Sequence, residues 1–313
     1  MGTTHDSLNA ALTPFLSADI SPYVRKAAKR IAKRFPNCSA VLFYGSCLRT
    51  GEVEGQMLDF YVIVDDYRGA FKSWGRVLGN RLIPPNVFYF EEEIDGLCVR
   101  AKYATLSSTH FERLCSDKTF NPAIWARFAQ PIALAYFRDE QISKHIAHCL
   151  GLAITTLLSN CAPLIMTAVS EKELWAFCFS QTYTTEFRAE NGGRPELIYD
   201  LMSNFYHEVT SAAVRNLSAI EERETGQISF SFAPKDRREA RIAWFFRRIQ
   251  GKLLHALRLI KGATTFDGGI DYLAWKIYRH SGVKMEIKPW HRRFPVIAGL
   301  IMLPRLRHKG AVK

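Results

Sequence analysis

The chain has 313 residues, of which 48% are apolar, and its formal net charge is +12 at pH 7. This length and composition predict one large domain or two smaller ones with a real hydrophobic core. The seven cysteines are scattered without the spacing of a zinc site, and no apolar run reaches the roughly 18 residues that a spanning helix needs. These features argue against a zinc-stapled or integral membrane protein. The positive charge favours an anionic partner, such as a nucleotide, a nucleic acid or an acidic lipid.

Residues 23–34 are the first clear element and predict a helix with basic residues on one face. A mitochondrial presequence can have this pattern, but it would lie nearer the first residue and contain more serine. We therefore expect this helix to pack on the first strand and to keep its lysines in solvent.

An apolar strand that ends on Gly45-Ser46 and a second apolar strand near residues 57–64 predict the functional site. Gly45 lacks a side chain, so its backbone can approach a triphosphate closely. Ser46 can donate its hydroxyl and N–H to phosphate oxygens, and a helix that begins there would add further donors. Asp59, on the second strand, is placed to hold Mg²⁺, which prefers oxygen ligands and bridges substrate phosphates. The pattern indicates metal-assisted attack on an α-phosphate.

One position departs from the usual pattern of nucleotidyltransferases. These enzymes mostly carry Asp-x-Asp on the second strand, where both carboxylates share one face, and here Tyr61 takes the second place. Either another acid completes the metal site or the enzyme is degenerate. We assign Asp65 and Asp66, just past the strand, to the metal together with Asp59. Glu91 to Glu93 are an alternative source, although acidic residues in a hairpin turn are usually just solvated.

The next segments predict the rest of an α+β domain over residues 1–140. We expect one helix over residues 67–81, ended by Pro84-Pro85. Strands over residues 86–90 and 97–103 follow, joined by a turn with an Asp-Gly signal. Strands with flanking helices indicate a nucleotidyltransferase-like mixed sheet.

From residue 141 onward the pattern becomes helical, and we assign residues 141–280 to a mainly helical substrate domain. The predicted helices cover residues 142–159, 171–182 with Ser170 as N-cap, 195–206, and the basic, aromatic segment 237–261, with a polar loop over 216–236. Residues 281–313 form a tail with an apolar segment between basic clusters. Such a tail favours peripheral attachment to an anionic membrane, and docking on its own domain is the alternative.

The order of several short motifs resembles the mitochondrial-type phosphatidate cytidylyltransferases, the translocator assembly and maintenance family of the nucleotidyltransferase superfamily. The similar segments are Tyr44-Gly45-Ser46, Met57 to Phe60, Val64 to Asp66, Lys102-Tyr103, Arg127 with Gln130-Pro131, Tyr183 to Arg188, and Lys261-Gly262. Ala104 stands where the family has glycine after Lys-Tyr. Members of this family use CTP and magnesium to convert phosphatidic acid into CDP-diacylglycerol.

The resemblance implies roles for the residues that it covers. The implied set comprises Tyr44, Gly45 and Ser46 on the nucleotide, Asp59, Lys102 and Glu186 in catalysis, and Arg127, Arg188 and Lys261 on phosphate or the lipid head group. A guanidinium suits such a contact because it binds phosphate through two parallel hydrogen bonds. A phosphate monoester is already anionic at neutral pH, so the attacking group needs no strong base.

We therefore expect a CTP:phosphatidate cytidylyltransferase with Mg²⁺ as cofactor. Its expected partners are CTP, phosphatidic acid and an anionic membrane surface, without nucleic acid. Two alternatives remain open: a nucleotidyltransferase that acts on RNA or protein, and a non-catalytic relative that binds nucleotide or lipid. The lack of a clear presequence favours a bacterial cytoplasm with peripheral membrane attachment, and the matrix side of the mitochondrial inner membrane is the alternative.

Overall fold

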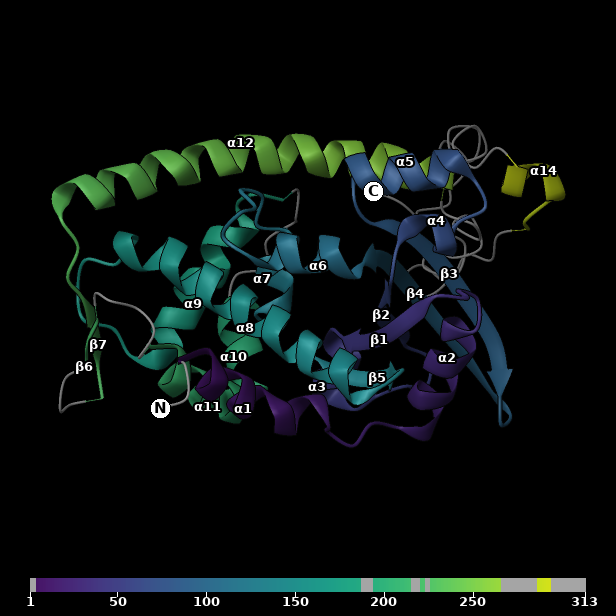
Figure 1. The fold of residues 1–313 in the computed structure, drawn as a ribbon, viewed down its shortest axis with the longest axis horizontal. Helices are drawn as coiled ribbons and strands as arrows, with labels where there is room; N and C mark the ends of the chain where they lie inside the picture. Colours follow the sequence, from purple (N-terminus) through teal and green to yellow (C-terminus); the bar gives the residue numbers. More distant parts are fainter. Residues whose placement is uncertain (1–3, 187–193, 215–219, 223–225, 266–285, 294–313) are drawn as a thin grey trace.

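The structure is a computed structural model, and it describes residues 4–186, 194–214, 220–222, 226–265 and 286–293. Its centre is a mixed sheet with the strand order β3-β4-β2-β1-β5, flanked by helices and continued on one side by a mainly helical region (Figure 1). The strands are β1 (Cys38–Tyr44), β2 (Met57–Val64), β3 (Asn86–Ile94), β4 (Leu97–Ser107) and β5 (Ala133–Phe137). The α+β class that the sequence predicts is confirmed.

Strand β1 is buried along its whole length, because hydrophobic layers cover both faces of the sheet. It pairs antiparallel with β2 and with β5, whereas β2 and β4 run parallel. Strands β3 and β4 form the predicted hairpin, and its turn places Asp95 and Gly96 at positive φ. Strand β5 has no counterpart among the sequence predictions.

One face of the sheet is covered by α2 (Pro22–Ala32), α4 (Tyr67–Ala70) and α5 (Trp74–Leu82). Helix α2 buries an apolar stripe against β1 and β5, which confirms the packing expected for the basic N-terminal helix. The single helix expected over residues 67–81 is instead two helices. The Asp66 side chain caps α4, and the chain turns extended at Phe71, so the first helix ends after one turn.

The other face is continuous with the helical region. This region comprises α1 (Thr4–Leu16), α6 (Ser108–Cys115), α7 (Trp125–Phe128), α8 (Glu140–Cys161), η1 (Ala162–Leu164), α9 (Glu171–Tyr183), α10 (Arg194–Asp200) and α11 (Ser203–Val214). Helix α1 packs on α8 and α11, and one apolar core joins these helices to the sheet. Helices α1, α6 and α7 precede residue 140 and share this core with α8, so the domain boundary near residue 140 stays a prediction. A turn at residues 201–202 divides the helix expected over residues 195–206 into α10 and α11.

Helix α8 is the centre of this second core. The segment Glu140–Leu164 is long and apolar enough to cross a membrane by length and composition, although no such run was expected from the sequence. However, 72% of its most apolar window is buried inside the protein. In this structure it acts as a core helix.

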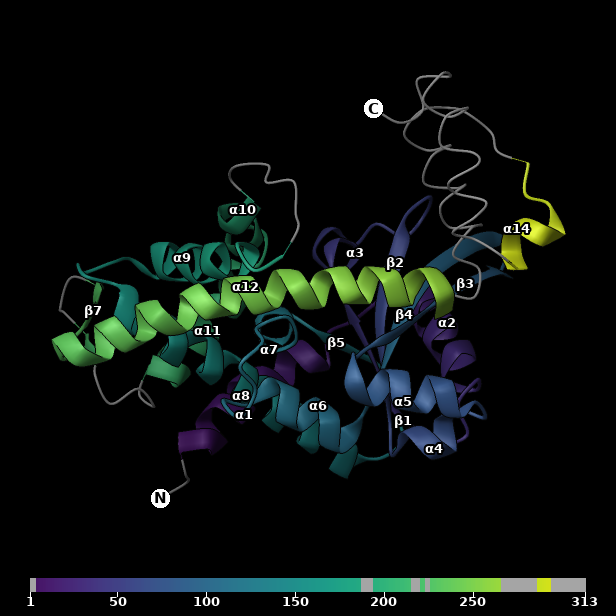
Figure 2. The ribbon, with the colours of Figure 1, turned by 90° about the horizontal axis from the view of Figure 1, so that it is seen from above.

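Helix α12 (Pro234–Thr265) extends across the whole molecule, from the helical region to the sheet (Figures 1 and 2). It includes the predicted basic segment 237–261. The Trp244 indole N–H donates to the Asn160 carbonyl at 2.8 Å, and Arg258 Nε donates to the Pro84 carbonyl at 2.8 Å. These contacts fix both halves of the helix to the body of the protein.

The remaining elements are short. They are α3 (Ser46–Thr50), the two-stranded sheet of β6 (Ile220–Glu222) and β7 (Ile228–Phe230), and α14 (Pro289–Arg293). Only residues 286–293 of the predicted tail over residues 281–313 are described, so its assignment to a membrane lies mostly outside the described residues.

A half-buried histidine on α6 predicts a pH-dependent stability. Arg113 donates to His110 Nε2 at 3.0 Å, so the ring proton lies on Nδ1 and faces the Tyr67 hydroxyl at 2.8 Å. Burial, and then the charge of Arg113, lower the pKa of His110 to about 4. Between its ordinary value near 6.5 and about 4, only the unfolded chain takes up this proton, so the free energy of unfolding falls as the pH falls.

We expect His110→Gln to flatten this loss of stability between pH 7 and pH 5 in urea titrations. His207→Gln is the matched control, because the His207 side chain is 74% exposed. Equal slopes for wild type and His110→Gln would show that the histidine is not the titrating group.

Candidate functional site

The glycine turn and the second strand meet as the sequence predicts. Tyr44, the last residue of β1, is paired with Asp59 of β2, and Gly45 follows with φ +93° and caps α3. An added Cβ at Gly45 would lie 2.7 Å from Asp59 Oδ2. The Asp59 carboxylate therefore lies directly against the turn, in the place where a phosphate could reach both.

Gly45→Ala is expected to lower the free energy of unfolding by about 1–3 kcal/mol, because it adds both a positive-φ strain and a clash with Asp59. Gly55→Ala separates the two effects, since Gly55 has φ +65° and open space around it. Urea unfolding of both variants gives the comparison. Equal losses would mean that the carboxylate is not held against the turn.

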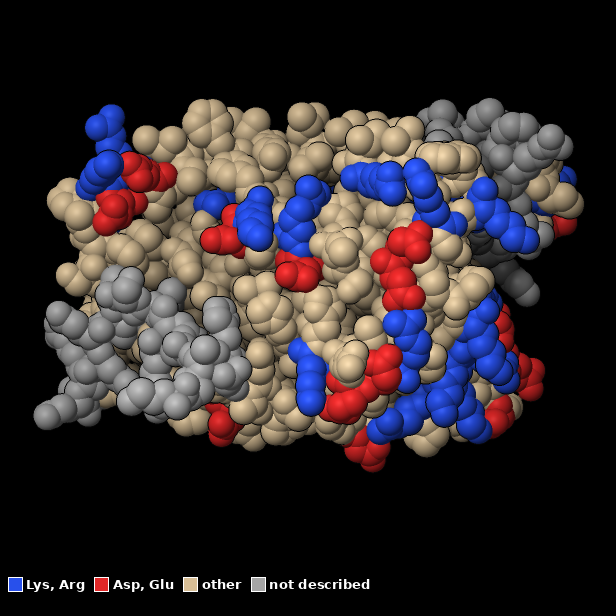
Figure 3. Space-filling view, viewed as in Figure 1, with Lys and Arg blue, Asp and Glu red and all other residues tan. Residues whose placement is uncertain are grey.

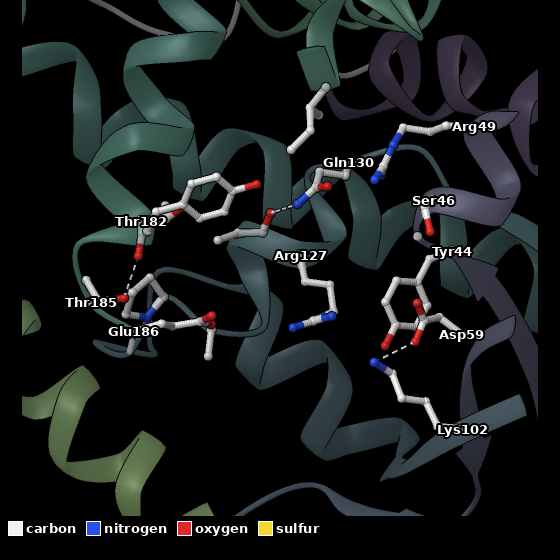
Figure 4. A pocket seen from close by; sticks show the side chains of 16 residues that line it. Tyr44, Ser46, Arg49, Asp59, Lys102, Arg127, Gln130, Thr182, Thr185 and Glu186 are labelled. Atoms are coloured by element: carbon white, nitrogen blue, oxygen red, sulfur yellow. Dashed lines mark hydrogen bonds and ion pairs between the residues drawn. The ribbon is translucent and has the colours of Figure 1, made fainter. Parts of the chain in front are cut away.

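A cavity of about 430 Å³ opens above this turn (Figure 4). Its lining comes from the turn and α3 (Gly45, Ser46, Arg49), from the strands (Tyr44, Asp59, Lys102), from the segment around α7 (Pro122, Ala123, Ala126, Arg127, Gln130), and from α9, its end and α10 (Thr182, Tyr183, Thr185, Glu186, Ile198). Three of these side chains are cationic and two are carboxylates. The arrangement suits a ligand with several negative charges and a bound cation.

Lys102 is the direct partner of Asp59. The two residues are paired across the parallel strands β2 and β4, and Lys102 Nζ lies 3.0 Å from Asp59 Oδ1. This oxygen is buried and receives no well-aligned hydrogen bond from the described residues. It therefore keeps a lone pair for a further cation.

Arg127 stands in the middle of the cavity, between Glu186 on one side and Tyr44 with Asp59 on the other (Figure 4). Its guanidinium lies 5.2 Å over the Tyr44 ring, and its Nε is buried without a hydrogen-bond partner. Burial alone would lower the pKa of Arg127, but the surrounding Tyr44, Tyr61, Glu186 and Asp59 raise it. Within the described part of the chain, no carboxylate forms an ion pair with this fixed charge. An anionic ligand would compensate it.

The opposite wall is the end of α9. The Thr185 hydroxyl donates to the Thr182 carbonyl at 2.7 Å, and Glu186 follows directly and lines the cavity. Gly251 of α12 packs against this end, because a Cβ there would lie 2.5 Å from the Thr185 carbonyl oxygen. The position of Glu186 is thus tied to α12.

A second hollow of about 510 Å³ adjoins the first and shares Tyr44, Lys102, Ala123, Arg127 and Glu186 with it. Its other walls are mainly apolar, with three residues of α12 at one side. They are Phe60, Tyr61, Pro85, Val87, Tyr103, Ala104 and Ile124, and then His255, Arg258 and Gly262. Two cationic side chains, Lys102 and Arg127, line both hollows.

The structure does not bring Asp65 and Asp66 to this cavity. Asp65 forms an ion pair with Arg138 at 2.7 Å, and Asp66 accepts hydrogen bonds from the N–H groups at the start of α4. Both follow the far end of β2, about 20 Å from Asp59 at the usual rise of a strand. The predicted metal set of Asp59, Asp65 and Asp66 is therefore corrected to Asp59 alone. The prediction grouped these acids because they are close in sequence, but an extended strand separates them in space.

Three further candidates lie elsewhere or cannot be placed. The Lys261 ammonium donates to the carbonyls of Gly79 and Ile83 at the end of α5, and burial lowers its pKa to about 8. Glu91 accepts a hydrogen bond from Arg100 at 2.9 Å on the outer part of the sheet. Arg188 lies outside the described residues.

Tyr61, in the usual place of the second aspartate, is buried against Tyr44 and Phe128. Burial raises the pKa of its hydroxyl, so it remains protonated at neutral pH. It acts as a packing residue under Arg127 and offers no anionic ligand.

Sequence reasoning missed several residues that line the cavities. Arg49 could have been found from its position, because it lies three residues after Ser46 and so faces the same way on a helix. Thr185 was covered only as part of the similar segment Tyr183 to Arg188, and Thr182 and Arg258 gave no comparable signal. Arg258 belongs to the other end of the chain and reaches the site only through the packing of α12.

The site fits a magnesium ion that is bound by Asp59 together with the phosphates of a substrate. The described residues contain no group of three or more histidine, cysteine or acidic side chains that could hold a metal. Magnesium commonly binds through one or two carboxylates and the phosphates of its substrate. Asp59, whose Oδ2 lies against the turn and whose Oδ1 accepts no aligned hydrogen bond from the described residues, suits this mode, whereas a preformed site made of protein ligands is not present there.

Comparison of the chain with protein-family models and with curated proteins gave no match. The functional assignment therefore rests on the site geometry, together with the motif resemblance.

Proposed function

We propose that this protein is a nucleotidyltransferase that transfers CMP from CTP to the phosphate of phosphatidic acid, giving CDP-diacylglycerol and pyrophosphate. One observation carries the proposal. The Asp59 carboxylate lies against the Gly45 turn at the base of a cavity that also holds Lys102 and the buried Arg127. This is a place for a triphosphate with its cation.

The phosphates of the nucleotide would bind to the hydrogen-bond donors and cationic side chains that face the cavity. Gly45 lets the backbone come close, and Ser46 offers its hydroxyl and N–H. Arg127 and Arg49 face the cavity as guanidinium donors. Magnesium, when bound with the phosphates at Asp59, would neutralise charge that develops on the transferred group.

The acceptor is inferred from the second hollow. It is lined mainly by apolar side chains, and its lining also contains the cations Lys102, Arg127 and Arg258, which outnumber the single carboxylate Glu186. Such a shape suits an amphiphile with a phosphate head. The head would then lie beside the triphosphate, since the two hollows share Lys102 and Arg127, and catalysis would come mainly from alignment and charge neutralisation.

A hydroxyl acceptor is the second candidate because of Glu186. A phosphate monoester needs no base, but a hydroxyl of RNA or protein does, and Glu186 is the carboxylate that faces Asp59 across the cavity (Figure 4). The apolar lining of the second hollow favours the lipid over these larger polar acceptors.

The test is incubation of the purified full chain with Mg²⁺, α-labelled CTP and phosphatidic acid in mixed micelles. We expect labelled CDP-diacylglycerol. Diacylglycerol is the matched control acceptor, because it has the same chains and a hydroxyl in place of the phosphate. Label in RNA or protein would support the second candidate, and nucleotide binding without turnover would show a non-catalytic protein. Parallel reactions with ATP, GTP and UTP test the choice of base.

A further inference from the structure

Helix α12 carries an apolar stripe on the side that faces away from the protein. Its members follow one another at spacings of one, three or four residues, which places them on one face of a helix. They are Ile242, Phe245, Phe246, Ile249, Leu253, Leu257 and Ile260, and each is between 36% and 66% exposed. We call this set the α12 stripe. Its length, from Ile242 to Ile260, is about 27 Å at the usual helical rise.

The stripe is distinct from the face by which α12 is attached. Trp244, Arg247 and Gly251 are buried against the body of the protein, and Arg247 donates to the Phe120 carbonyl at 3.0 Å. The attachment of α12 therefore leaves the stripe uncovered by the described residues.

Helix α5 extends this apolar surface. Trp74, Leu78 and Leu82 are spaced four residues apart on α5, and each is more than half exposed. Lys261 of α12 donates to the carbonyls of Gly79 and Ile83, so the two helices are joined at this end. Figures 1 and 2 show α5 beside α12 at the same edge of the molecule. We call the combined set the α12–α5 surface.

Basic side chains border this surface. Arg241, Arg248 and Lys252 are exposed, and helical geometry places them along one flank of the α12 stripe. Between residues 238 and 260, Glu239 is the one acidic residue. In Figure 3 the upper edge of the molecule, where α12 and α5 lie, is mostly uncharged, and lysine and arginine gather just below it.

We propose that the α12–α5 surface docks on an anionic lipid bilayer, with α12 lying in the plane of the interface. A helix with an apolar face and a basic flank binds in this way, because its apolar side chains enter the boundary of the acyl region while the cations contact lipid phosphates. A second copy of the chain is the less favourable occupant. A two-fold contact through the same stripe would bring two basic flanks together with almost no acidic residue to balance them.

Docking would bring the second hollow close to the membrane, with α12 between them. His255, Arg258 and Gly262 line that hollow from the face of α12 opposite the stripe. This consequence rests on the proposed function, whereas the docking itself does not. The two are tested separately.

The experiment is co-sedimentation of the full chain with phosphatidylcholine vesicles that contain about one third phosphatidylglycerol, compared with pure phosphatidylcholine. The test variant is Ile249→Asp/Leu253→Asp, at the centre of the stripe. The control variant is Phe137→Asp/Leu201→Asp, which adds the same charge at two exposed apolar residues on other elements. Light scattering after gel filtration gives the oligomeric state of each protein.

We expect wild type and the control variant to pellet with the anionic vesicles, and the stripe variant to bind at least about tenfold more weakly. All three should be monomeric. Unchanged binding of the stripe variant would overturn the proposal. So would a wild-type dimer that the stripe variant converts to monomer, because a second copy would then cover the surface. Asp59→Ala should bind vesicles like wild type, so a failure of the proposed chemistry would leave this result intact.

Discussion

Asp59→Ala is expected to lower the rate of CMP transfer by at least about a thousandfold. The variant removes the carboxylate that lies against the Gly45 turn and the acid that is best placed to hold a cation at the nucleotide phosphates. Lys102 would lose its ion-pair partner, but the pair is partly solvent-exposed, so the fold should be retained. Product formation from labelled CTP gives the rate, and thermal unfolding checks the fold.

Asp65→Ala is the matched control for this experiment. It removes a carboxylate from the far end of the same strand, where Asp65 pairs with Arg138. Full activity of Asp65→Ala beside an inactive Asp59→Ala would assign the chemistry to the Gly45 end of the sheet. Substantial activity in Asp59→Ala would remove the basis of the enzymatic proposal.

Arg127→Met is expected to weaken CTP binding about a hundredfold, or about 2.7 kcal/mol, while the free energy of unfolding changes little. Arg127 is a buried cation with an unsatisfied Nε and no ion pair among the described residues. Burial of such a charge is costly, but the surrounding tyrosines and carboxylates offset that cost in the folded protein, so a methionine of similar length should change its stability little. Calorimetric titration with CTP and urea unfolding measure the two quantities.

Arg247→Met gives the contrast. Arg247 is also buried, but it donates to the Phe120 carbonyl and to the Asn160 side chain, so its loss should reduce stability and leave CTP binding unchanged. If Arg127→Met destabilises the protein as Arg247→Met does, then Arg127 is a structural residue and the cavity has no special need for an anion.

The local part of the site could be predicted from the sequence. The turn at Gly45 and the pairing of β1 with β2 are encoded within a short segment, where an apolar strand and a glycine are followed, after a short helix and loop, by a second apolar strand. The helix starting at Ser170 was equally readable, since Ser170 and Glu173 form a reciprocal cap.

The other parts of the site depend on contacts that no local pattern contains. Arg127, Glu186 and Arg258 reach the cavities from α7, from the end of α9 and from α12, and they meet only because one core joins the sheet to the helices. Asp65 shows the opposite error. It is six residues from Asp59 in sequence, but a strand places residues at that separation about 20 Å apart, toward its opposite ends.

The contact between Gly251 and Thr185 links helix α12, on the outside of the molecule, to the wall of the cavity. A side chain at residue 251 would strike the backbone just before Glu186, so α12 cannot shift inward without moving that carboxylate. The helix that carries the α12 stripe therefore also supports the wall of the cavity that holds Glu186. If the α12–α5 surface docks on a bilayer as proposed, a load on its outer face would reach this wall through the packed contact at Gly251.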